Sequence, residues 1–207
     1  GADFFSGTDT EVILHSYFLW GWKKTLEILE GMFGLAIYDE TKKKIFLARD
    51  RFGMKPLFYA KYGHAIIFSS EIKAILHYIG KAKIDFLSSL NPLFTTGLSP
   101  KGRTVFEDVQ QLQEGHYLEC DLLKGSFATK RYFHVSEWIN ESQYRKMQKS
   151  SEAEILKDYE NALTDSVEQH LISDAPLGCL YSGGVDSSVA VQIAVNQKRI
   201  LLYHFES

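Results

Sequence analysis

The chain has 207 residues, of which 45% are hydrophobic and 24% are charged, so its composition is that of a folded globular protein rather than a disordered one. The formal net charge of −3 excludes the basic excess of a nucleic-acid-binding protein and a polybasic membrane anchor. Two cysteines cannot form a disulfide framework, which favours a reducing compartment. No apolar run is long enough to span a membrane and the first residues do not resemble a signal peptide. We therefore expect a cytoplasmic protein with neither nucleic acid nor membrane as a partner.

The first third of the chain predicts a helix followed by antiparallel strands. Thr8 and Glu11 have the spacing of a capping box, and the helix that they open is expected to end at Gly21. Glycines at positions 53 and 63 mark turns between the strands that follow, which predicts an antiparallel meander. The expected strands are residues 31–38, 44–48, 55–61 and 64–70.

The middle of the chain continues with helices, a loop and further strands. Helices are expected at residues 71–78 and 86–96, and a loop at residues 97–103, which contain two glycines and a proline. Strands are expected at residues 105–109, 115–120 and 127–133. Residues 136–150 are polar and contain few aliphatic side chains, so we place a linker there.

The last part of the chain has the pattern of a parallel α/β unit. Ser151 and Glu154 form a second capping box, which opens an amphipathic helix that ends near Ile172. A buried strand (177–181), a loop (182–188), a helix (189–195) and a second buried strand (200–205) are expected next. Two strands cannot bury both faces of such a sheet, so the second domain is expected to be incomplete.

The strongest functional pattern is residues 182–188, Ser-Gly-Gly-Val-Asp-Ser-Ser. Glycines at the start of a helix let backbone N–H groups approach an anion, and the helix N-terminus adds a partial positive charge. Ser182, Ser187 and Ser188 offer hydroxyl donors, and Asp186 is a candidate magnesium ligand beside a phosphate. The alternative is a tight turn with Ser and Asp as helix caps. The segment is neither a Gly-x4-Gly-Lys-Ser/Thr loop nor a Gly-x-Gly-x-x-Gly fingerprint.

This segment resembles the pyrophosphate loop of the N-type ATP pyrophosphatases. Upstream segments resemble one branch of them, the glutamine-dependent asparagine synthetases, and with the loop they follow the family order over nearly the whole chain. The upstream segments are residues 8–12 (Thr-Asp-Thr-Glu-Val), 29–33 (Leu-Glu-Gly-Met-Phe), 47–59 (Leu-Ala-Arg-Asp-Arg-Phe-Gly-Met-Lys-Pro-Leu-Phe-Tyr), 69–76 (Ser-Ser-Glu-Ile-Lys-Ala-Ile-Leu) and 112–118 (Leu-Gln-Glu-Gly-His-Tyr-Leu).

The resemblance implies a fold and a reaction. Residues 1–140 are expected to be a class II glutaminase domain of the N-terminal-nucleophile type, an α+β sandwich of antiparallel sheets with helices. Residues 141–150 would be a linker, and residues 151–207 the start of an α/β synthetase domain with a parallel sheet. The family hydrolyses glutamine to ammonia, adenylates aspartate with ATP and Mg²⁺, and lets ammonia displace AMP to give asparagine. Another carboxylate acceptor (a sugar acid or a β-lactam precursor), a non-catalytic binding module and a homodimer remain open.

The resemblance also implies residue roles. Asp9 would hold the α-amino group of glutamine, although an acid in the first turn of a helix is the structural alternative. The glutaminase nucleophile of the family is an N-terminal cysteine, whereas this chain starts at Gly1 and neither Cys120 nor Cys179 has the family context. We therefore expect a fragment that is inactive by itself, with no catalytic residue in it. The residues expected to bind ATP are Leu180, Ser182, Gly183, Gly184, Asp186, Ser187, Ser188 and Ser207, with Asp186 also the metal ligand.

Several charged residues are left without an assigned role. Glu71 is interpreted as the acid of a helix N-terminus, and Lys42–Lys44 as the solvated tip of a turn. The seven histidines show no pair at the spacing of zinc ligands. Four charged side chains near Gly53 either line an ammonia path or a domain interface, or brace the turn through salt bridges; they are Arg49, Asp50, Arg51 and Lys55.

Overall fold

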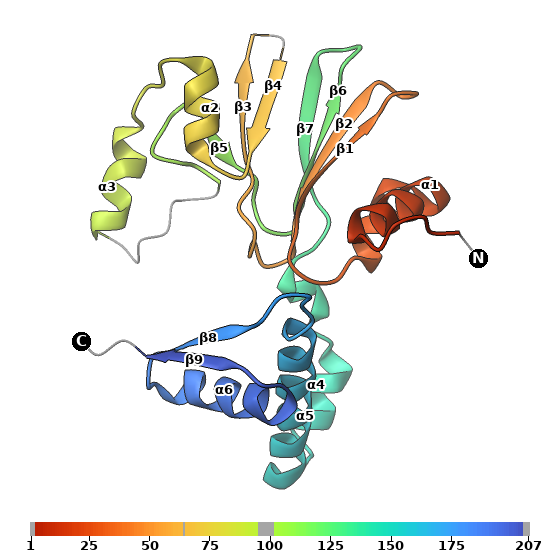
Figure 1. The fold of residues 1–207 in the computed structure, drawn as a ribbon, viewed down its shortest axis with the longest axis vertical. Helices are drawn as coiled ribbons and strands as arrows, with labels where there is room; N and C mark the ends of the chain where they lie inside the picture. The colour runs from red at the N-terminus through yellow and green to blue at the C-terminus, as the bar shows by residue number, and fades with distance from the viewer. Residues whose placement is uncertain (1–2, 64, 95–101, 205–207) are drawn as a thin grey trace. The chain divides into compact units, whose positions relative to one another are not determined.

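The computed structural model describes residues 3–63, 65–94 and 102–204. The chain forms two compact units, Gly1–Trp138 and Ile139–Ser207, and each is described by itself (Figure 1). None of the helices in the described ranges is long and apolar enough to cross a membrane.

The first unit contains a four-stranded antiparallel sheet and a three-stranded antiparallel sheet. The four-stranded sheet has the order β1-β2-β6-β7, and the three-stranded sheet has the order β4-β3-β5. Their strands are β1 (Gly34–Asp39), β2 (Lys44–Arg49), β6 (His116–Asp121) and β7 (Ser126–Arg131) in the first sheet, and β3 (Phe58–Tyr62), β4 (Ala65–Ser69) and β5 (Gln110–Gln111) in the second.

The expected meander of four consecutive strands is wrong. The β1–β2 and β3–β4 hairpins belong to different sheets, because β2 pairs with β6 on its second edge while β3 pairs with β5. The expected strand at residues 105–109 is also wrong. Within it Phe106 forms only an isolated bridge with Ile84, and the strand itself is the short β5 that follows.

The first unit is built in four layers. Alternation along β2 sends Leu47 into the core between the two sheets, and Phe46 and Ala48 into the core beneath α1 (Asp9–Ile28). On the outer face of the other sheet, Ile75 of α2 (Ile72–Ile79) packs with Ala60 of β3. Figure 1 shows one helix layer outside each sheet. This arrangement confirms the expected α+β sandwich of antiparallel sheets with helices.

Helix α1 differs from its prediction at both ends. Thr8 makes no side-chain capping bond; Glu11 instead accepts hydrogen bonds from the backbone N–H groups of Phe5 and Ser6. At Gly21 the backbone leaves helical geometry (φ 76°, ψ 172°), as the sequence indicates, but a second helical segment continues to Ile28. It continues because Leu26 is fully buried on the sheet, so this segment has an apolar face of its own.

The second unit has two longer helices and a pair of parallel strands. Ser151 and Glu154 form the expected capping box of α5. Gly178 of β8 lies opposite Leu201 of β9, and the parallel pairing confirms the expected α/β class. A 3-10 turn (Val135–Trp138) precedes residues 141–150, and this expected linker contains α4. Phe205, the end of the second expected strand, lies outside the described residues. The elements are α4 (Glu141–Met147), α5 (Glu152–His170), β8 (Gly178–Tyr181), α6 (Val185–Gln197) and β9 (Leu201–His204), while α3 (Phe86–Phe94) belongs to the first unit.

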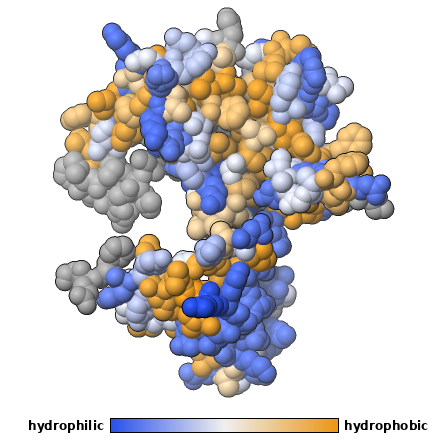
Figure 2. Space-filling view, in the orientation of Figure 1, coloured by the Kyte–Doolittle hydropathy of each residue, from blue (hydrophilic) through white to orange (hydrophobic). Residues whose placement is uncertain are grey.

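The expectation that the two parallel strands are buried is wrong in the described structure, because their apolar side chains are exposed. Leu180, Leu201 and Leu202 are 70%, 55% and 48% exposed. Figure 2 shows hydrophobic side chains at the surface of the second unit.

Candidate nucleotide-binding site

The candidate site is the connection between β8 and α6. The strand ends at Tyr181 and the helix begins at Val185, so the expected loop of residues 182–188 is wrong in length. Only residues 182–184 connect the two elements, and Asp186 lies in the first turn of α6. The helix begins earlier because an acid and two serines are compatible with a first turn, where the helix dipole favours negative charge.

The serine hydroxyl groups brace this turn. Ser187 Oγ and Ser188 Oγ both donate to the carbonyl oxygen of Gly184, at 2.9 and 2.7 Å. Ser182 Oγ lies 2.9 Å from Ser187 Oγ, so the hydroxyl groups gather on one side of the connection. This bracing is what the structural alternative requires, and it also fixes the backbone at the start of the helix.

The backbone N–H groups of the turn remain available to an anion. Gly184 occupies the N-cap position of α6 and makes no side-chain capping bond, so the donors of the first turn are uncapped. Gly183 has φ +79°, a conformation that glycine adopts without strain. A Cβ atom at Gly183 would meet no heavy atom within 4 Å, so there is open space in front of the turn. This arrangement can hold a phosphate group.

Asp186 provides one exposed carboxylate beside that space. The described residues contain no group of three or more His, Cys, Asp or Glu side chains that could hold a metal ion. One carboxylate nevertheless fits Mg²⁺, which proteins commonly bind through one or two carboxylates together with substrate phosphates and water. Leu180 is exposed at the end of the adjoining strand, and Ser207 lies outside the described residues.

Asp9 does not belong to this site. It is the first residue of α1 in the first unit, it is exposed, and its carboxylate accepts a hydrogen bond from Thr10 at 3.5 Å. The structure therefore places Asp9 in the first turn of a helix. Asp9 lies in the first unit, whereas the predicted ATP-binding residues that the structure describes lie in the second unit.

The charged turn near Gly53 is braced through the backbone rather than through the expected salt bridges. Asp50 is buried, and its carboxylate accepts hydrogen bonds from four backbone N–H groups, those of residues 33, 52, 54 and 55. Arg49 donates to the carbonyl oxygens of residues 53, 55 and 112, and burial lowers the pKa of its guanidinium. These two side chains hold the turn in shape.

Arg51 and Glu71, two further charged residues without an assigned role, make contacts of different kinds. Arg51 donates to the carbonyl oxygen of Glu27 and lies 5.6 Å from the ring centre of Phe133. Glu71 occupies the N-cap of α2, where its carboxylate pairs with Lys73 instead of capping the helix.

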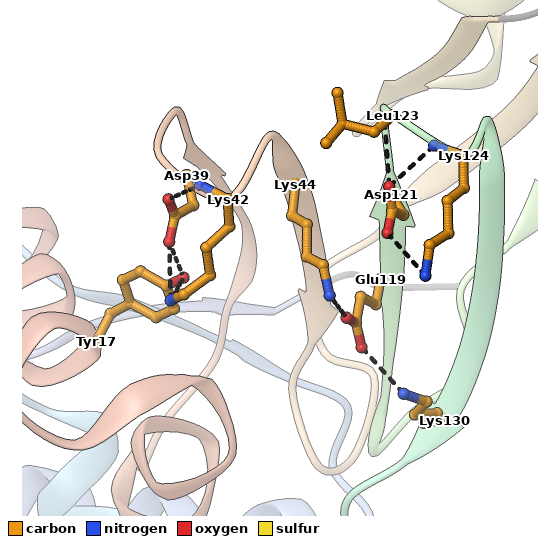
Figure 3. Close-up of polar contacts among 9 residues, drawn as sticks. All are labelled: Tyr17, Asp39, Lys42, Lys44, Glu119, Asp121, Leu123, Lys124 and Lys130. Carbon is orange, nitrogen blue, oxygen red and sulfur yellow. Dashed lines mark hydrogen bonds and ion pairs between the residues drawn. The ribbon is translucent and has the colours of Figure 1, made fainter.

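Sequence reasoning missed one cluster of charged side chains. Lys44 contacts Glu119 at 2.6 Å and is not the solvated tip that was expected, whereas Lys42 lies in the turn with its side chain 59% exposed, as expected, and contacts Asp39 at 3.0 Å (Figure 3). The alternation of side chains along the strand could have indicated the contact between Lys44 and Glu119. Lys44 shares a face with Phe46, which lies opposite Glu119 on β6.

Comparisons with known proteins fit this organisation. The sequence model of the family described as a glutamine amidotransferase domain matches residues 1–133. The chain therefore belongs to the glutamine amidotransferase domain family. A second family, described as asparagine synthase, matches residues 158–205, which include the strand–turn–helix of the candidate site.

Similar curated proteins carry matching names. Asparagine synthetase [glutamine-hydrolyzing] 2 of Bacillus subtilis is 34% identical over 92% of this chain and 26% of its own length. Asparagine synthetase [glutamine-hydrolyzing] 3 of the same organism is 34% identical over 100% of this chain and 31% of its own length. A putative asparagine synthetase of Methanocaldococcus jannaschii is 32% identical over 91% and 35%. The chain thus spans about a third or less of these relatives.

Among solved structures, a glutamine phosphoribosylpyrophosphate amidotransferase from B. subtilis, complexed with ADP and GMP, is similar over 99% of this chain and 40% of its own. Its sequence identity is 18% and its TM-score is 0.46.

Proposed function

We propose that the chain is part of a glutamine-hydrolysing asparagine synthetase that makes asparagine from aspartate. The two family matches, in this order along the chain, and the names of the relatives support this proposal. Residues 1–140 would belong to the glutaminase domain, residues 151–207 to the synthetase domain, and residues 141–150 would connect them. Asp9 would hold the α-amino group of glutamine in the first of these domains.

The observation that carries the synthetase part is the uncapped N-terminus of α6 behind Gly183 and Gly184. The phosphates of ATP would lie on these backbone N–H groups, because a helix N-terminus with free donors favours an anion. Leu180 and Ser207 would lie toward the adenine, outside the carboxyl ends of the two parallel strands. Asp186 would hold Mg²⁺, which neutralises charge on the phosphates.

The proposed reaction has two bond-forming steps. A carboxylate oxygen of aspartate attacks the α-phosphorus of ATP, a new P–O bond forms and pyrophosphate leaves with the bonding electron pair. Ammonia from glutamine then attacks the acyl carbon, the bond between that carbon and the AMP oxygen breaks, AMP leaves with the electron pair, and the nitrogen loses one proton as asparagine forms. The N–H groups of the turn would hold the pyrophosphate portion while its negative charge grows, which is where oriented donors lower the barrier most.

The test is Asp186→Ala in the full-length protein, assayed with ATP, glutamine and aspartate. Pyrophosphate release should fall by at least about 100-fold, because the carboxylate that holds the metal is removed. Glutamate release should remain, since that reaction belongs to the other domain. Asp165→Ala, a change at an exposed acid of α5, is the matched control and should retain both activities. Undiminished pyrophosphate release by Asp186→Ala would contradict the proposed role of this residue.

The acceptor is tested separately with a panel of carboxylic acids that includes sugar acids and β-lactam precursors. Pyrophosphate release only with an acid other than aspartate would show that the protein uses the same chemistry on a different acceptor. If no acid supports release and glutamine is not hydrolysed, the protein is a non-catalytic member.

The phosphate site has its own test. Addition of ATP and Mg²⁺ should shift the amide resonances of Gly183 and Gly184. Unmoved resonances at saturation would overturn the assignment of the phosphate site.

A further inference from the structure

A basic hollow lies on the outer face of the four-stranded sheet, in the first unit. Its volume is about 380 Å³, within the size range of small-ligand sites. It is formed where the kink of α1 at Gly21 meets the β1–β2 turn and the β6–β7 hairpin. Four of its lining residues are lysines: Lys23, Lys42, Lys44 and Lys130.

Two of these lysines share one carboxylate. Glu119 of β6 contacts Lys44 Nζ at 2.6 Å and Lys130 Nζ at 3.0 Å, and Figure 3 shows it between them. These hydrogen bonds lower the pKa of Glu119 and raise the pKa of both lysines. All three groups are therefore charged at neutral pH, and one positive charge in this group is not balanced.

The other two lysines approach from the turn and from the helix. Lys42 Nζ lies 3.0 Å from Asp39 and 3.0 Å from the hydroxyl oxygen of Tyr17. Lys23 forms no ion pair with any residue in the described ranges. Four lysines against two carboxylates, those of Glu119 and Asp39, leave a local charge of +2 in a chain whose formal net charge is −3.

Aromatic side chains form the wall of the hollow. Trp22, Phe46 and Tyr117 all line it, and the ring centres of Trp22 and Phe46 are 5.0 Å apart. The apolar wall reduces the water that screens Lys44, whose side chain is 29% exposed, whereas those of Lys42 and Lys130 are 59% and 49% exposed. The sandwich fold thus brings cations from three elements to one partly apolar site.

The positive charges of the lining come from lysines, with no arginine among them. Lysine binds phosphate as a compact point charge with three rotatable N–H donors, so several lysines can approach the oxygens of one phosphate from different directions. We propose that this hollow binds a small phosphate-bearing anion, at a site distinct from the turn between β8 and α6.

The experiment uses the full-length protein labelled with 5-fluorotryptophan and observed by fluorine NMR. The signal of Trp22 is assigned by its loss in Trp22→Phe. Inorganic phosphate, pyrophosphate and AMP are titrated separately at constant ionic strength. A saturable shift of the Trp22 signal is expected, while Trp138, which does not line the hollow, should not shift with it. Equal affinity for the three probes would show that the phosphate group suffices; tighter binding of AMP would show that the ring contributes.

Variants connect the shift to the lysines. Lys44→Gln combined with Lys130→Gln should weaken binding by at least about tenfold, since contacts of a charged donor each contribute on this scale. Lys24→Gln combined with Lys73→Gln removes the same charge from residues outside the lining and should leave the affinity unchanged. The variant that lacks Lys44 and Lys130 leaves the Glu119 carboxylate without a positive partner. Lys23→Gln is a milder change, because it breaks no ion pair, and it should weaken binding several-fold.

Three results would overturn the proposal. One is the absence of a saturable Trp22 shift with every probe up to about 10 mM, a concentration at which even weak specific sites fill. Another is unchanged affinity in Lys23→Gln and in the variant without Lys44 and Lys130. The last is a dependence of the Trp22 shift on Asp186, tested with Asp186→Ala, because that would assign the response to the nucleotide site of the second unit.

Discussion

At the scale of single residues, Asp50 shows how a charged group can be structural. Its carboxylate receives four backbone N–H groups, and its own carbonyl oxygen accepts the N–H groups of Gly53 and Gly115. The residue therefore joins the end of β2 to the turn that follows and to the segment before β6. A buried carboxylate needs this number of donors to offset the loss of water.

We predict that Asp50→Ala destabilises the first unit by about 3 kcal/mol or more, because several buried N–H groups lose their acceptor. Asp50→Asn keeps one oxygen acceptor and should have a smaller effect. Tryptophan fluorescence during urea unfolding measures both, since all three tryptophans precede residue 139. An Ala variant as stable as the native chain would show that the turn is held mainly by Arg49.

We predict a pH-dependent contribution from Asp39. Hydrogen bonds from the Tyr17 hydroxyl, the Lys42 backbone N–H and the Lys42 ammonium hold the pKa of Asp39 well below its usual 3.8. The stabilisation is therefore present above pH 3.8 and is lost as pH falls, because the unfolded chain takes up the proton first. Asp39→Asn should lower stability near neutral pH, and the difference from the native chain should shrink as the solution becomes more acidic. Urea unfolding across this range measures it; a constant difference would contradict the linkage.

The sequence supports some residue assignments and not others, for a physical reason. Gly183 and Gly184 could be placed in a turn before a helix because such a turn depends on neighbours in the chain. The bracing by Asp50 depends partly on the N–H group of Phe33, 17 residues away. The contact between Lys44 and Glu119 spans 75 residues. Such contacts are fixed by strand register and sheet pairing, which one sequence does not specify.

At the scale of elements, the kink of α1 provides a direct test of backbone strain. Gly21 has φ 76° and ψ 172°, a region that is essentially restricted to glycine. Gly21→Ala should destabilise the first unit by about 1–3 kcal/mol. Gly7→Ala is the matched control: both positions have open space for a Cβ atom, and only Gly21 has a positive φ. Equal urea midpoints for the two variants would show that the kink can relax.

The elements that sequence reasoning placed well are those with strong local patterns. Helix α5 begins with its capping box at Ser151, and the β8–α6–β9 unit forms the expected parallel pair. The errors arose where tertiary pairing overrides local pattern. Residues 105–109 are apolar enough for a strand, but Val109 is buried in the core beneath α2 and the ladder forms after it.

At the scale of the whole molecule, burial differs greatly between the two units. Val191 and Ala194 are the only buried apolar residues among those described after residue 138. In the 207-residue chain the second unit should therefore unfold at lower urea than the first. The far-UV signal of α5 and α6 should fall before tryptophan fluorescence changes. A single coincident transition would show instead that the units unfold as one cooperative body.

The two outer edges of the four-stranded sheet have different consequences for handling this protein. Strand β7 carries Lys130 and Arg131, charges that oppose edge-to-edge association. Strand β1 has the sequence Gly-Leu-Ala-Ile-Tyr-Asp, with no lysine, arginine or proline, and in the described structure it pairs only with β2. Its free backbone groups can template another strand. Edge-to-edge association of the 207-residue chain is therefore expected at β1, as it is at the uncharged edge strand β4 (Ala-Ile-Ile-Phe-Ser), and Ala36→Lys at an exposed position of β1 should reduce it.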